Sequence, residues 1–206
     1  MEKHRITKLK QGVRDENRVN VFVDGKFVFS LDISQVVDFK LKVGQEISKE
    51  ELSELEKASE FGKLYQRTLE WVLIRPRSER ETYDYLKKKT FEKRLDENYI
   101  GSIIEKLEDK KYLDDLKFAE WYVENRFVKK GVSRRRLEVE LVKKGISREI
   151  INQVFSESER NDETEILKII EKKRAKYDDE KLIQYLVRQG FSYELVRDLV
   201  QIHGKD

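Results

Sequence analysis

The chain carries one pattern of apolar positions three times, and this pattern predicts a repeated helix. Apolar residues recur at positions i, i+1, i+4 and i+5, which places them on a single stripe of an α-helix. The three sets are Tyr99, Ile100, Ile103 and Ile104, then Ile150, Ile151, Val154 and Phe155, and finally Leu195, Val196, Leu199 and Val200. We predict an amphipathic helix at each place, begun by the N-cap residues Asp96, Ser147 and Ser192.

A second predicted helix stands before each of these. It begins at a Ser or Asp eight positions ahead of a leucine, because their oxygens accept from the free N–H groups of a first turn. These caps are Ser78, Ser133 and Asp178. Gly145 and Gly190 supply left-handed stops in the second and third copies, where the first copy has Thr90 and Phe91. The first caps of copies one and two, Ser78 and Ser133, are 55 positions apart, whereas their second caps, Asp96 and Ser147, are 51 positions apart. The connection after Thr90 should therefore be four residues longer than its counterpart.

A third helix precedes each pair, at roughly 62–75, 114–127 and 163–176. Self-similarity of this kind is typical of stacked units that bury a face against their neighbours. The predicted fold class is therefore mainly α, an elongated tandem array of three three-helix units with a small N-terminal region that contains a β-hairpin. We place the strand-rich N-terminal region at 1–47 and the three helical units at 48–111, 112–160 and 161–206.

The N-terminal region alternates polar and apolar residues, which predicts strands. We expect strands at 6–10, 18–23 and 26–31, with a type I′ turn at Asp24-Gly25 joining the last two. Their candidate buried residues are Val19, Val21, Val23, Phe27, Phe29 and Leu31. A three-stranded sheet alone is marginal, so we expect it to pack against the first helical unit as a capping domain.

A long charged helix should follow, because Ser48 and Glu51 form a capping-box pattern. Gly62 is expected to bend or divide this helix. Pro76, the only proline, should end it before Ser78 starts the next one.

Composition then excludes several classes of chemistry. The 206 residues are 41% charged and 38% hydrophobic, which suits small helical units with much surface better than one large core. There is no cysteine for a disulfide or a thiolate site, His4 and His203 are the only histidines, and no glycine-rich phosphate loop occurs. The acidic pair Asp114 and Asp115 is interpreted as helix capping rather than as metal ligands. We therefore expect no enzyme, no catalytic residue, no metal and no cofactor.

The chain has no apolar run near the length of a membrane span and no recognisable signal peptide. We expect a cytoplasmic protein without membrane contact.

Positive charge is concentrated in the second predicted unit. The segment 126–148 holds nine Lys or Arg against two Glu, whereas 155–165 carries an excess of negative charge. Arg134, Arg135 and Arg136 occupy a first helical turn, where the helix dipole disfavours cations, so helix stability does not explain them. Arginine matches phosphate and carboxylate geometry, so a nucleic-acid backbone or an acidic protein surface would satisfy the run. Ion pairing with Glu138 and Glu140 is the alternative within the chain.

We predict a partner- or DNA-binding surface from these charges. Its candidate residues are Arg75, Arg77, Lys87, Lys88, Lys89, Arg126, Lys129, Lys130, Arg134, Arg135, Arg136, Lys143, Lys144 and Arg148. Two helices joined by a glycine turn also resemble helix-turn-helix DNA readers. The third helix of each unit offers few base-reading side chains, so non-specific backbone contact is the better form of that alternative.

Several motifs of the central segment occur together in one known family. They are YLDD at 112–115, KFAEWYV at 117–123, KKG at 129–131, SRRRLEVEL at 133–141 and KKGI at 143–146. In order and spacing they strongly resemble the RecX family, bacterial regulators of the RecA recombinase. The run RPRSERETYDYL at 75–86 resembles the first-unit signature of that family. The resemblance covers most of residues 63–206, whereas the strand-rich region looks like an extension of some longer members.

The resemblance implies a tandem array of three-helix units that lies in the helical groove of the RecA–DNA filament. Such proteins modulate RecA, typically by inhibiting strand exchange, ATP hydrolysis and LexA-type coprotease activity. We accordingly expect a monomeric, non-enzymatic regulator in the SOS response, homologous recombination and DNA repair. Its expected partners are the RecA filament and, more weakly and without sequence preference, single- or double-stranded DNA. The alternative is a stand-alone DNA-binding protein of the helix-turn-helix type.

Overall fold

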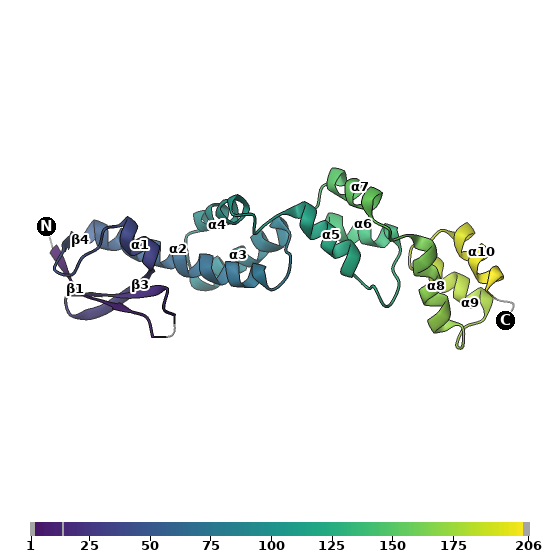
Figure 1. The fold of residues 1–206 in the computed structure, drawn as a ribbon, viewed down its shortest axis with the longest axis horizontal. Coiled ribbons are helices and arrows are strands. Elements are labelled where there is room, and N and C mark those ends of the chain that lie inside the picture. Colours follow the sequence, from purple (N-terminus) through teal and green to yellow (C-terminus); the bar gives the residue numbers. More distant parts are fainter. Residues whose placement is uncertain (1–2, 14, 204–206) are drawn as a thin grey trace. The chain divides into compact units, whose positions relative to one another are not determined.

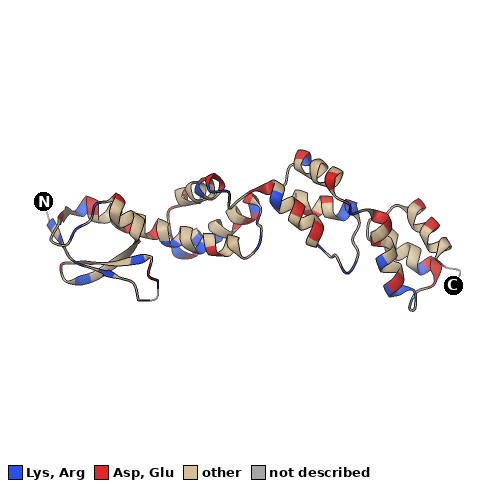
Figure 2. Ribbon diagram, viewed as in Figure 1, with Lys and Arg blue, Asp and Glu red and all other residues tan. Residues whose placement is uncertain are grey.

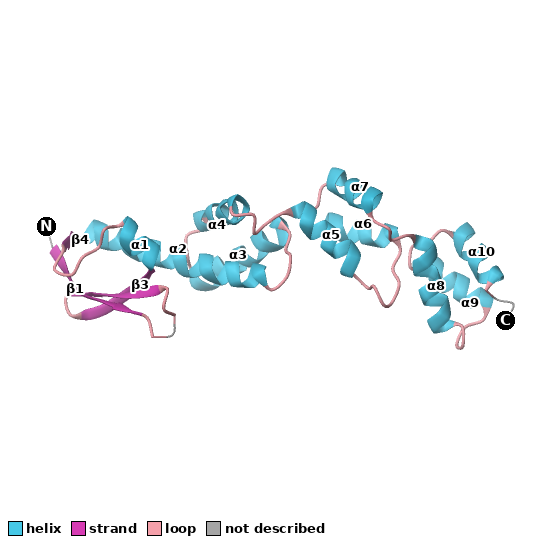
Figure 3. Ribbon diagram, viewed as in Figure 1, coloured by secondary structure: helices cyan, strands magenta, loops and turns pink. Residues whose placement is uncertain are grey.

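The computed structural model describes residues 3–13 and 15–203, which form a small antiparallel sheet and a series of helices (Figure 1). The strands are β1 Lys3–Gln11, β2 Arg18–Val23, β3 Lys26–Asp32 and β4 Glu46–Ser48. The helices are α1 Ile33–Asp38, α2 Lys49–Leu73, α3 Glu79–Lys93, α4 Asn98–Asp109, α5 Asp115–Asn125, α6 Arg134–Lys143, α7 Arg148–Glu157, α8 Asp162–Lys173, α9 Asp179–Arg188 and α10 Tyr193–Ile202. Within the described residues, all strands precede α2 (Figure 3). The predicted mainly α class with a strand-rich N-terminal region is therefore confirmed.

The residues fall into two compact units by their contacts. One comprises Met1–Trp71 and Leu86–Ile103, and the other comprises Val72–Tyr85 and Ile104–Asp206. Helices α3 and α4 each contribute residues to both units. The second unit holds the start of α3 and helices α5 to α10, and with them most of the predicted binding residues. The four-part division expected from the sequence stays a prediction.

The sheet is antiparallel, in the order β3-β2-β1-β4. The predicted turn is present, with positive φ at both Asp24 and Gly25. The fourth strand, β4, was not predicted, because its three residues are too few to show an alternation of polar and apolar positions. The prediction that Phe27 is buried is wrong. The register shifts between Val21 and Phe22, Phe27 pairs with Phe22, and its side chain is 55% exposed.

Helix α2 packs on the sheet through its N-terminal half, as expected for a sheet too small to be stable alone. Its capping box is formed: the Glu51 N–H donates to Ser48 Oγ at 3.1 Å, and Glu51 Oε2 accepts from the Ser48 N–H at 2.7 Å. Leu55 is buried in the core of the sheet, with Leu52 and Ala58 packed against that core.

Two helix boundaries differ from the sequence prediction. Helix α2 is not divided at Gly62, where the missing side chain instead makes room for Gln35 of α1, since an added Cβ would lie 2.9 Å from Gln35 Oε1. Helix α3 continues past Thr90 to Lys93 and is followed by a left-handed residue, Arg94, with φ of 53°. Because no glycine stands after Thr90, the extra residues of this copy lengthen the helix rather than only the connection.

Helices α5–α7 and α8–α10 form two helical triples, each with its own core. Helix α7 packs on α5 and α6, and α10 packs on α8 and α9. In each predicted apolar stripe the last three residues are buried, whereas the first, Ile150 or Leu195, is partly buried. The helix pattern read from the sequence therefore identifies both cores.

A polar joint links the start of α3 to the first of these triples. The Ser78 hydroxyl caps α3 by accepting from the Glu81 N–H at 3.1 Å, and it donates at 2.8 Å to the carbonyl of Lys144, the C-cap of α6. Beside it, the Glu79 N–H donates to the Asp115 carboxylate at 2.9 Å. Ser78 is fully buried, so the hydroxyl end of this contact is shielded from water.

A second joint of the same design links α6 to the triple α8–α10. The Ser133 hydroxyl accepts from the Arg136 N–H at 3.3 Å and donates at 2.7 Å to the carbonyl of Gln189, the C-cap of α9. The Arg134 N–H donates to Asp162 at 2.7 Å, as Glu79 does to its aspartate in the first joint. Ser133 is also fully buried.

Glycine stops allow both joints to close. Gly145 and Gly190 have φ of +87° and +94°, and a Cβ would lie 2.7 Å from Arg80 Cβ at the first and 2.9 Å from Ser133 Oγ at the second. Helix α9 is capped differently, by an exposed Asp178 that accepts from the Lys181 N–H at 2.9 Å. A serine hydroxyl can accept and donate, whereas an ionised aspartate can only accept. The buried caps thus need a side chain with a hydroxyl group.

The second joint also contains a buried carboxylate, Glu165 of α8, whose side chain is 1% exposed. It accepts from the Val132 N–H at 2.9 Å, from Arg160 at 2.8 Å and from Lys168 at 2.6 Å. Burial alone would raise the pKa of Glu165, but these hydrogen bonds, led by that of Arg160, lower it below its usual value.

Ser133→Asp should destabilise the protein by about 2 kcal/mol, because the Gln189 carbonyl loses its donor and faces a buried carboxylate. Asp178→Ser is the matched control, since it exchanges one good cap for another at an exposed site and should cost less than about 0.5 kcal/mol. Urea unfolding of the whole chain measures both changes. Equal effects would show that Ser133 acts only as a cap.

Glu165→Gln should lower the free energy of unfolding at neutral pH by about 3 kcal/mol, because Arg160, whose side chain is only 11% exposed, loses its counter-charge. The folded-state pKa of Glu165 is depressed, so its contribution is present above the unfolded-state pKa and is lost as pH falls through the folded-state value. The difference between the two proteins should therefore shrink below about pH 4. Urea titrations at neutral and acid pH test this, and a difference independent of pH would contradict it.

Candidate partner-binding surface

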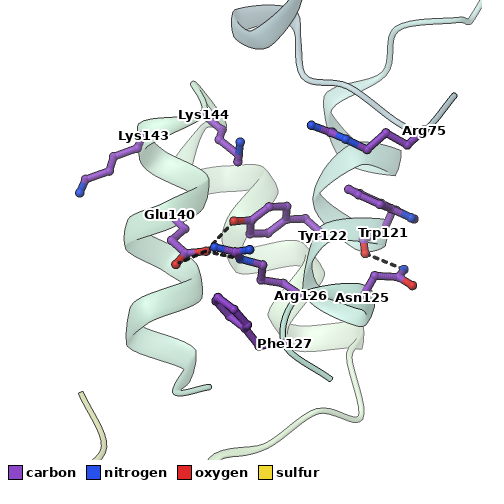
Figure 4. Close-up of a pocket in the computed structure, with 9 residues that line it drawn as sticks. All are labelled: Arg75, Trp121, Tyr122, Asn125, Arg126, Phe127, Glu140, Lys143 and Lys144. Atoms are coloured by element: carbon purple, nitrogen blue, oxygen red, sulfur yellow. Dashed lines mark hydrogen bonds and ion pairs between the residues drawn. The ribbon is translucent and has the colours of Figure 1, made fainter. Parts of the chain in front are cut away.

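A groove of about 640 Å³ lies between α5 and α6 in the second compact unit. It is lined by Arg75, Trp121, Tyr122, Asn125, Arg126, Phe127, Glu140, Lys143 and Lys144. Figure 4 shows Arg75 beside Trp121 on one side of the groove and Lys143 and Lys144, at the end of α6, on the other, with Tyr122 and Arg126 between them. Four of the predicted binding residues are thus brought together around aromatic rings.

Glu140 of α6 binds the polar groups at the centre of the groove. Its carboxylate accepts from the Tyr122 hydroxyl, from Arg126 Nε at 2.8 Å and from Arg136 Nε at 3.3 Å. Burial alone would raise the pKa of Glu140, but the hydrogen bond and charge of Arg126, with the other donors, lower it. Burial and the neighbouring carboxylate raise the pKa of Tyr122, so its phenol stays protonated and donates.

Glu81 of α3 holds the cations at the joint. Arg75 donates to its two carboxylate oxygens at 3.0 and 3.3 Å, and Lys144 Nζ donates to one of them. Burial alone would raise the pKa of Glu81, but the hydrogen bonds from Arg75 and Lys144 lower it. Arg75 also lies 5.3 Å from the Trp121 ring centroid, within range of a cation–π interaction.

The turn after α5 sets the position of another ring. Phe127 has φ of 52°, a left-handed conformation that is uncommon for an aromatic residue. Its carbonyl accepts from the Lys130 and Gly131 N–H groups at 2.8 and 3.0 Å, which fixes the turn. The Arg126 guanidinium lies 3.8 Å from the Phe127 ring centroid. The turn that positions Phe127 therefore also places this ring against a cation of the groove.

Two of the three arginines at the start of α6 have internal partners. Arg134 Nε pairs with Glu138 at 2.7 Å. Arg136 pairs with Glu140 and donates to Gln189 Oε1 at 2.7 Å. The alternative expected from the sequence, ion pairing with nearby glutamates, is therefore present. Both arginine side chains nevertheless remain 51% and 44% exposed.

The side chains of five predicted residues in this unit make no hydrogen bond or ion pair within residues 3–13 and 15–203. They are Lys129, Lys130, Arg135, Lys143 and Arg148, and all five are exposed. Arg135, Val139 and Lys143 follow one another along α6 at i, i+4 and i+8, and Val139 is 48% exposed. Figure 2 shows basic and acidic residues interleaved along the helices. The five cations can meet an external partner without breaking an internal contact.

The remaining predicted residues lie outside the groove. Arg77 is half-buried, and burial, together with the charge of Arg75, lowers the pKa of its guanidinium. Residues 87–89 belong to the other compact unit, where Lys88 and Lys89 pair with Glu92 at 3.8 and 2.8 Å. Lys87 is exposed.

The acidic pair at the start of α5 caps helices, as interpreted from the sequence. Asp114 accepts from the N–H groups of Leu116 and Lys117, both at 3.1 Å, and Asp115 accepts from Glu79 in the first joint. Throughout the described part of the chain, no cluster of His, Cys, Asp or Glu could hold a metal ion. In the same residues, no helix has the length and apolarity needed to cross a bilayer.

The residues that the sequence did not single out are Glu81 and the aromatic rings of the groove. The apolar spacing of α5 predicts Trp121 and Tyr122 as core residues, yet both also line the groove. Glu81 carries a usable signal, because a serine N-cap with glutamate three positions later is a capping-box pattern. That pattern locates Glu81 on the first turn of α3 but says nothing of Lys144.

Two family models match separate parts of the chain. One is described as the N-terminal domain of regulatory protein RecX and matches residues 4–48, and the other is the second three-helix domain of RecX and matches residues 114–154. The strand-rich region, expected to be an extension of some longer members, is thus matched by a family model of its own.

Relatives and solved structures extend the similarity over nearly the whole chain. The regulatory protein RecX of Bacillus licheniformis is 32% identical over 204 residues, which are 95% of this chain and 76% of that protein. That of Bacillus subtilis is 34% identical over 199 residues, 93% of this chain and 74% of that protein.

A crystal structure of regulatory protein RecX matches the fold with a TM-score of 0.71 at 22% identity, covering 98% of this chain and all of that chain. The crystal structure of RecX from Lactobacillus salivarius gives a TM-score of 0.56 at 25% identity, covering 69% of this chain and 95% of that chain. With about one residue in three shared with relatives along nearly its whole length, the chain belongs to the RecX family of regulatory proteins.

Proposed function

We propose that this protein binds RecA nucleoprotein filaments and inhibits their recombinase, ATPase and coprotease activities, without catalysing a reaction itself. The observation that carries the proposal is the similarity to RecX regulatory proteins over nearly the whole chain. In the proposal the protein acts in the cytoplasm as a monomer, and DNA contact is weaker and non-specific.

The distribution of charge supports a filament as partner. The five free cations are spread over the turn before α6, over α6 itself and over the start of α7. Many separate weak contacts with a repeating partner raise the total affinity without any single deep pocket. Free cations also contribute more to association than cations already paired, because no internal ion pair has to be broken.

The double variant Arg135→Glu with Arg148→Glu should inhibit RecA less well. Two exposed attractive charges become repulsive, so the concentration needed for half-inhibition of RecA ATP hydrolysis should rise by about tenfold or more, equivalent to about 1.4 kcal/mol. Neither side chain has an internal partner among the described residues, so the fold should be unaffected.

The matched control is Lys172→Glu with Lys176→Glu, which makes the same change in net charge on the triple α8–α10, at exposed positions whose side chains have no partner among the described residues. Its inhibition should stay close to that of the unmodified protein. If both double variants inhibit as the parent does, Arg135 and Arg148 are not part of the filament contact.

Salt dependence separates the proposal from the alternative of a stand-alone DNA-binding protein. Free duplex binding should be weak and should not follow the inhibition of RecA across the variants. A stand-alone DNA-binding protein would bind duplex tightly, and each lost phosphate contact would reduce the slope of log affinity against log salt by about 0.9. Gel-shift titrations with the parent and the Arg135→Glu, Arg148→Glu variant measure this slope without RecA. Tight binding with a slope reduced in the variant would favour the alternative.

A further inference from the structure

We infer that the groove between α5 and α6 is a binding site for an acidic peptide segment in which a carboxylate stands next to an aromatic or large apolar side chain. The inference rests on the proposed function for its biological setting, since the segment would belong to the protein partner. Binding of the peptide itself requires no filament.

The charge of the groove favours an acidic ligand. Four cations line it, and two carboxylates contact them, Glu140 inside the groove and Glu81 behind Arg75 and Lys144. The cations therefore exceed their internal counter-charges. Lys143 in particular has no internal partner among the described residues and stands on the α6 side of the groove (Figure 4).

The internal contacts also show which anion these cations accept. Arg75 binds the carboxylate of Glu81 with two parallel N–H groups, and Arg126 binds that of Glu140. This is the forked geometry by which arginine recognises carboxylates. A carboxylate from a partner would find the same donors already aligned.

The rings of the groove suit an apolar neighbour of that carboxylate. Trp121, Tyr122 and Phe127 line the site, and its volume falls within the range of about 300–1,000 Å³ that is usual for ligand sites. Aromatic rings that lie next to cations can contact an aromatic side chain while its carboxylate neighbour meets the charge.

The carboxylates of the groove favour a peptide over a nucleic acid. Glu140, and Glu81 behind the groove, would repel a phosphate and a carboxylate alike, but a phosphodiester backbone also has no proton to donate to them. A peptide backbone offers N–H donors to the same oxygens. The groove thus has acceptors for the peptide amides as well as donors for its acidic side chains.

Glu81 would compete with the ligand for Arg75 and Lys144. A ligand carboxylate that takes these donors must displace Glu81, whose hydrogen bonds hold it in the ionised form. Removing the charge of Glu81 should consequently strengthen binding. A residue that only supported the fold would not do so.

The test uses the full chain and a short fluorescein-labelled peptide in which glutamates alternate with phenylalanines, followed by fluorescence anisotropy. Glu81→Gln should tighten peptide binding by about threefold to tenfold, because the internal competitor loses its charge. Lys143→Glu should weaken binding by about fivefold or more, at a position that has no internal contact to lose. Lys172→Glu, which makes the same charge change on helix α8 of the triple α8–α10, should leave binding unchanged.

A peptide with glutamine in place of glutamate should not bind, and a single-stranded oligonucleotide should not respond to the groove variants. Absence of saturable peptide binding, weaker binding by Glu81→Gln, or an oligonucleotide that shows the same response as the peptide would each overturn the inference. Inhibition of RecA ATP hydrolysis by the unmodified protein is measured separately. Peptide binding without such inhibition would contradict the proposed function alone, and inhibition without peptide binding would contradict the groove alone.

Discussion

The arrangement of the second compact unit depends on a hydroxyl group that accepts and donates at once. Where the start of one helix meets the end of another away from solvent, an N–H group of the first helix and a carbonyl of the second both need a hydrogen-bond partner from a side chain. Ser78 and Ser133 satisfy both groups with a single side chain. The helical triples are thereby fixed to their neighbours by contacts of defined direction, in addition to the apolar cores that each triple has for itself.

The groove is a consequence of the first joint. Because Ser78 holds the first turn of α3 against the end of α6, Glu81 comes within reach of Lys144, although 63 residues separate them. The second joint uses the same serine contact but places its carboxylate, Glu165, in the interior. The same serine contact is therefore accompanied by a surface site at the joint of Ser78 and by a buried ionic contact at the joint of Ser133.

The parts of this structure that were predictable from sequence are those set by neighbours along the chain. Helical periodicity and capping residues are local, so the stripes of α7 and α10 and the cap at Ser48 followed from the pattern. The exposure of Phe27 did not, because it depends on a register shift in the partner strand. The end of α3 did not, because no glycine marks it.

The same distinction holds for the candidate site. The pairing of Arg134 with Glu138 lies four residues apart on one helix and could be read from the sequence. The bonds from Arg136 to Gln189 and from Lys144 to Glu81 join residues more than fifty positions apart, and only the folded chain shows them. Their basic members were predicted as a group, but the division into paired and free cations was not.

The aspartate that caps α9 has a consequence for how copies of the protein behave toward one another. Its neighbour Lys181 lowers the pKa of Asp178, so the side chain stays ionised and has no proton to offer. Asp178, at the exposed start of α9, therefore cannot donate a hydrogen bond to the C-cap carbonyl of α6 or α9 in another molecule, as Ser78 and Ser133 do within the chain. The hydroxyl-to-carbonyl hydrogen bond that joins neighbouring helices within the chain is thus not available at α9 to join separate molecules into a fibre.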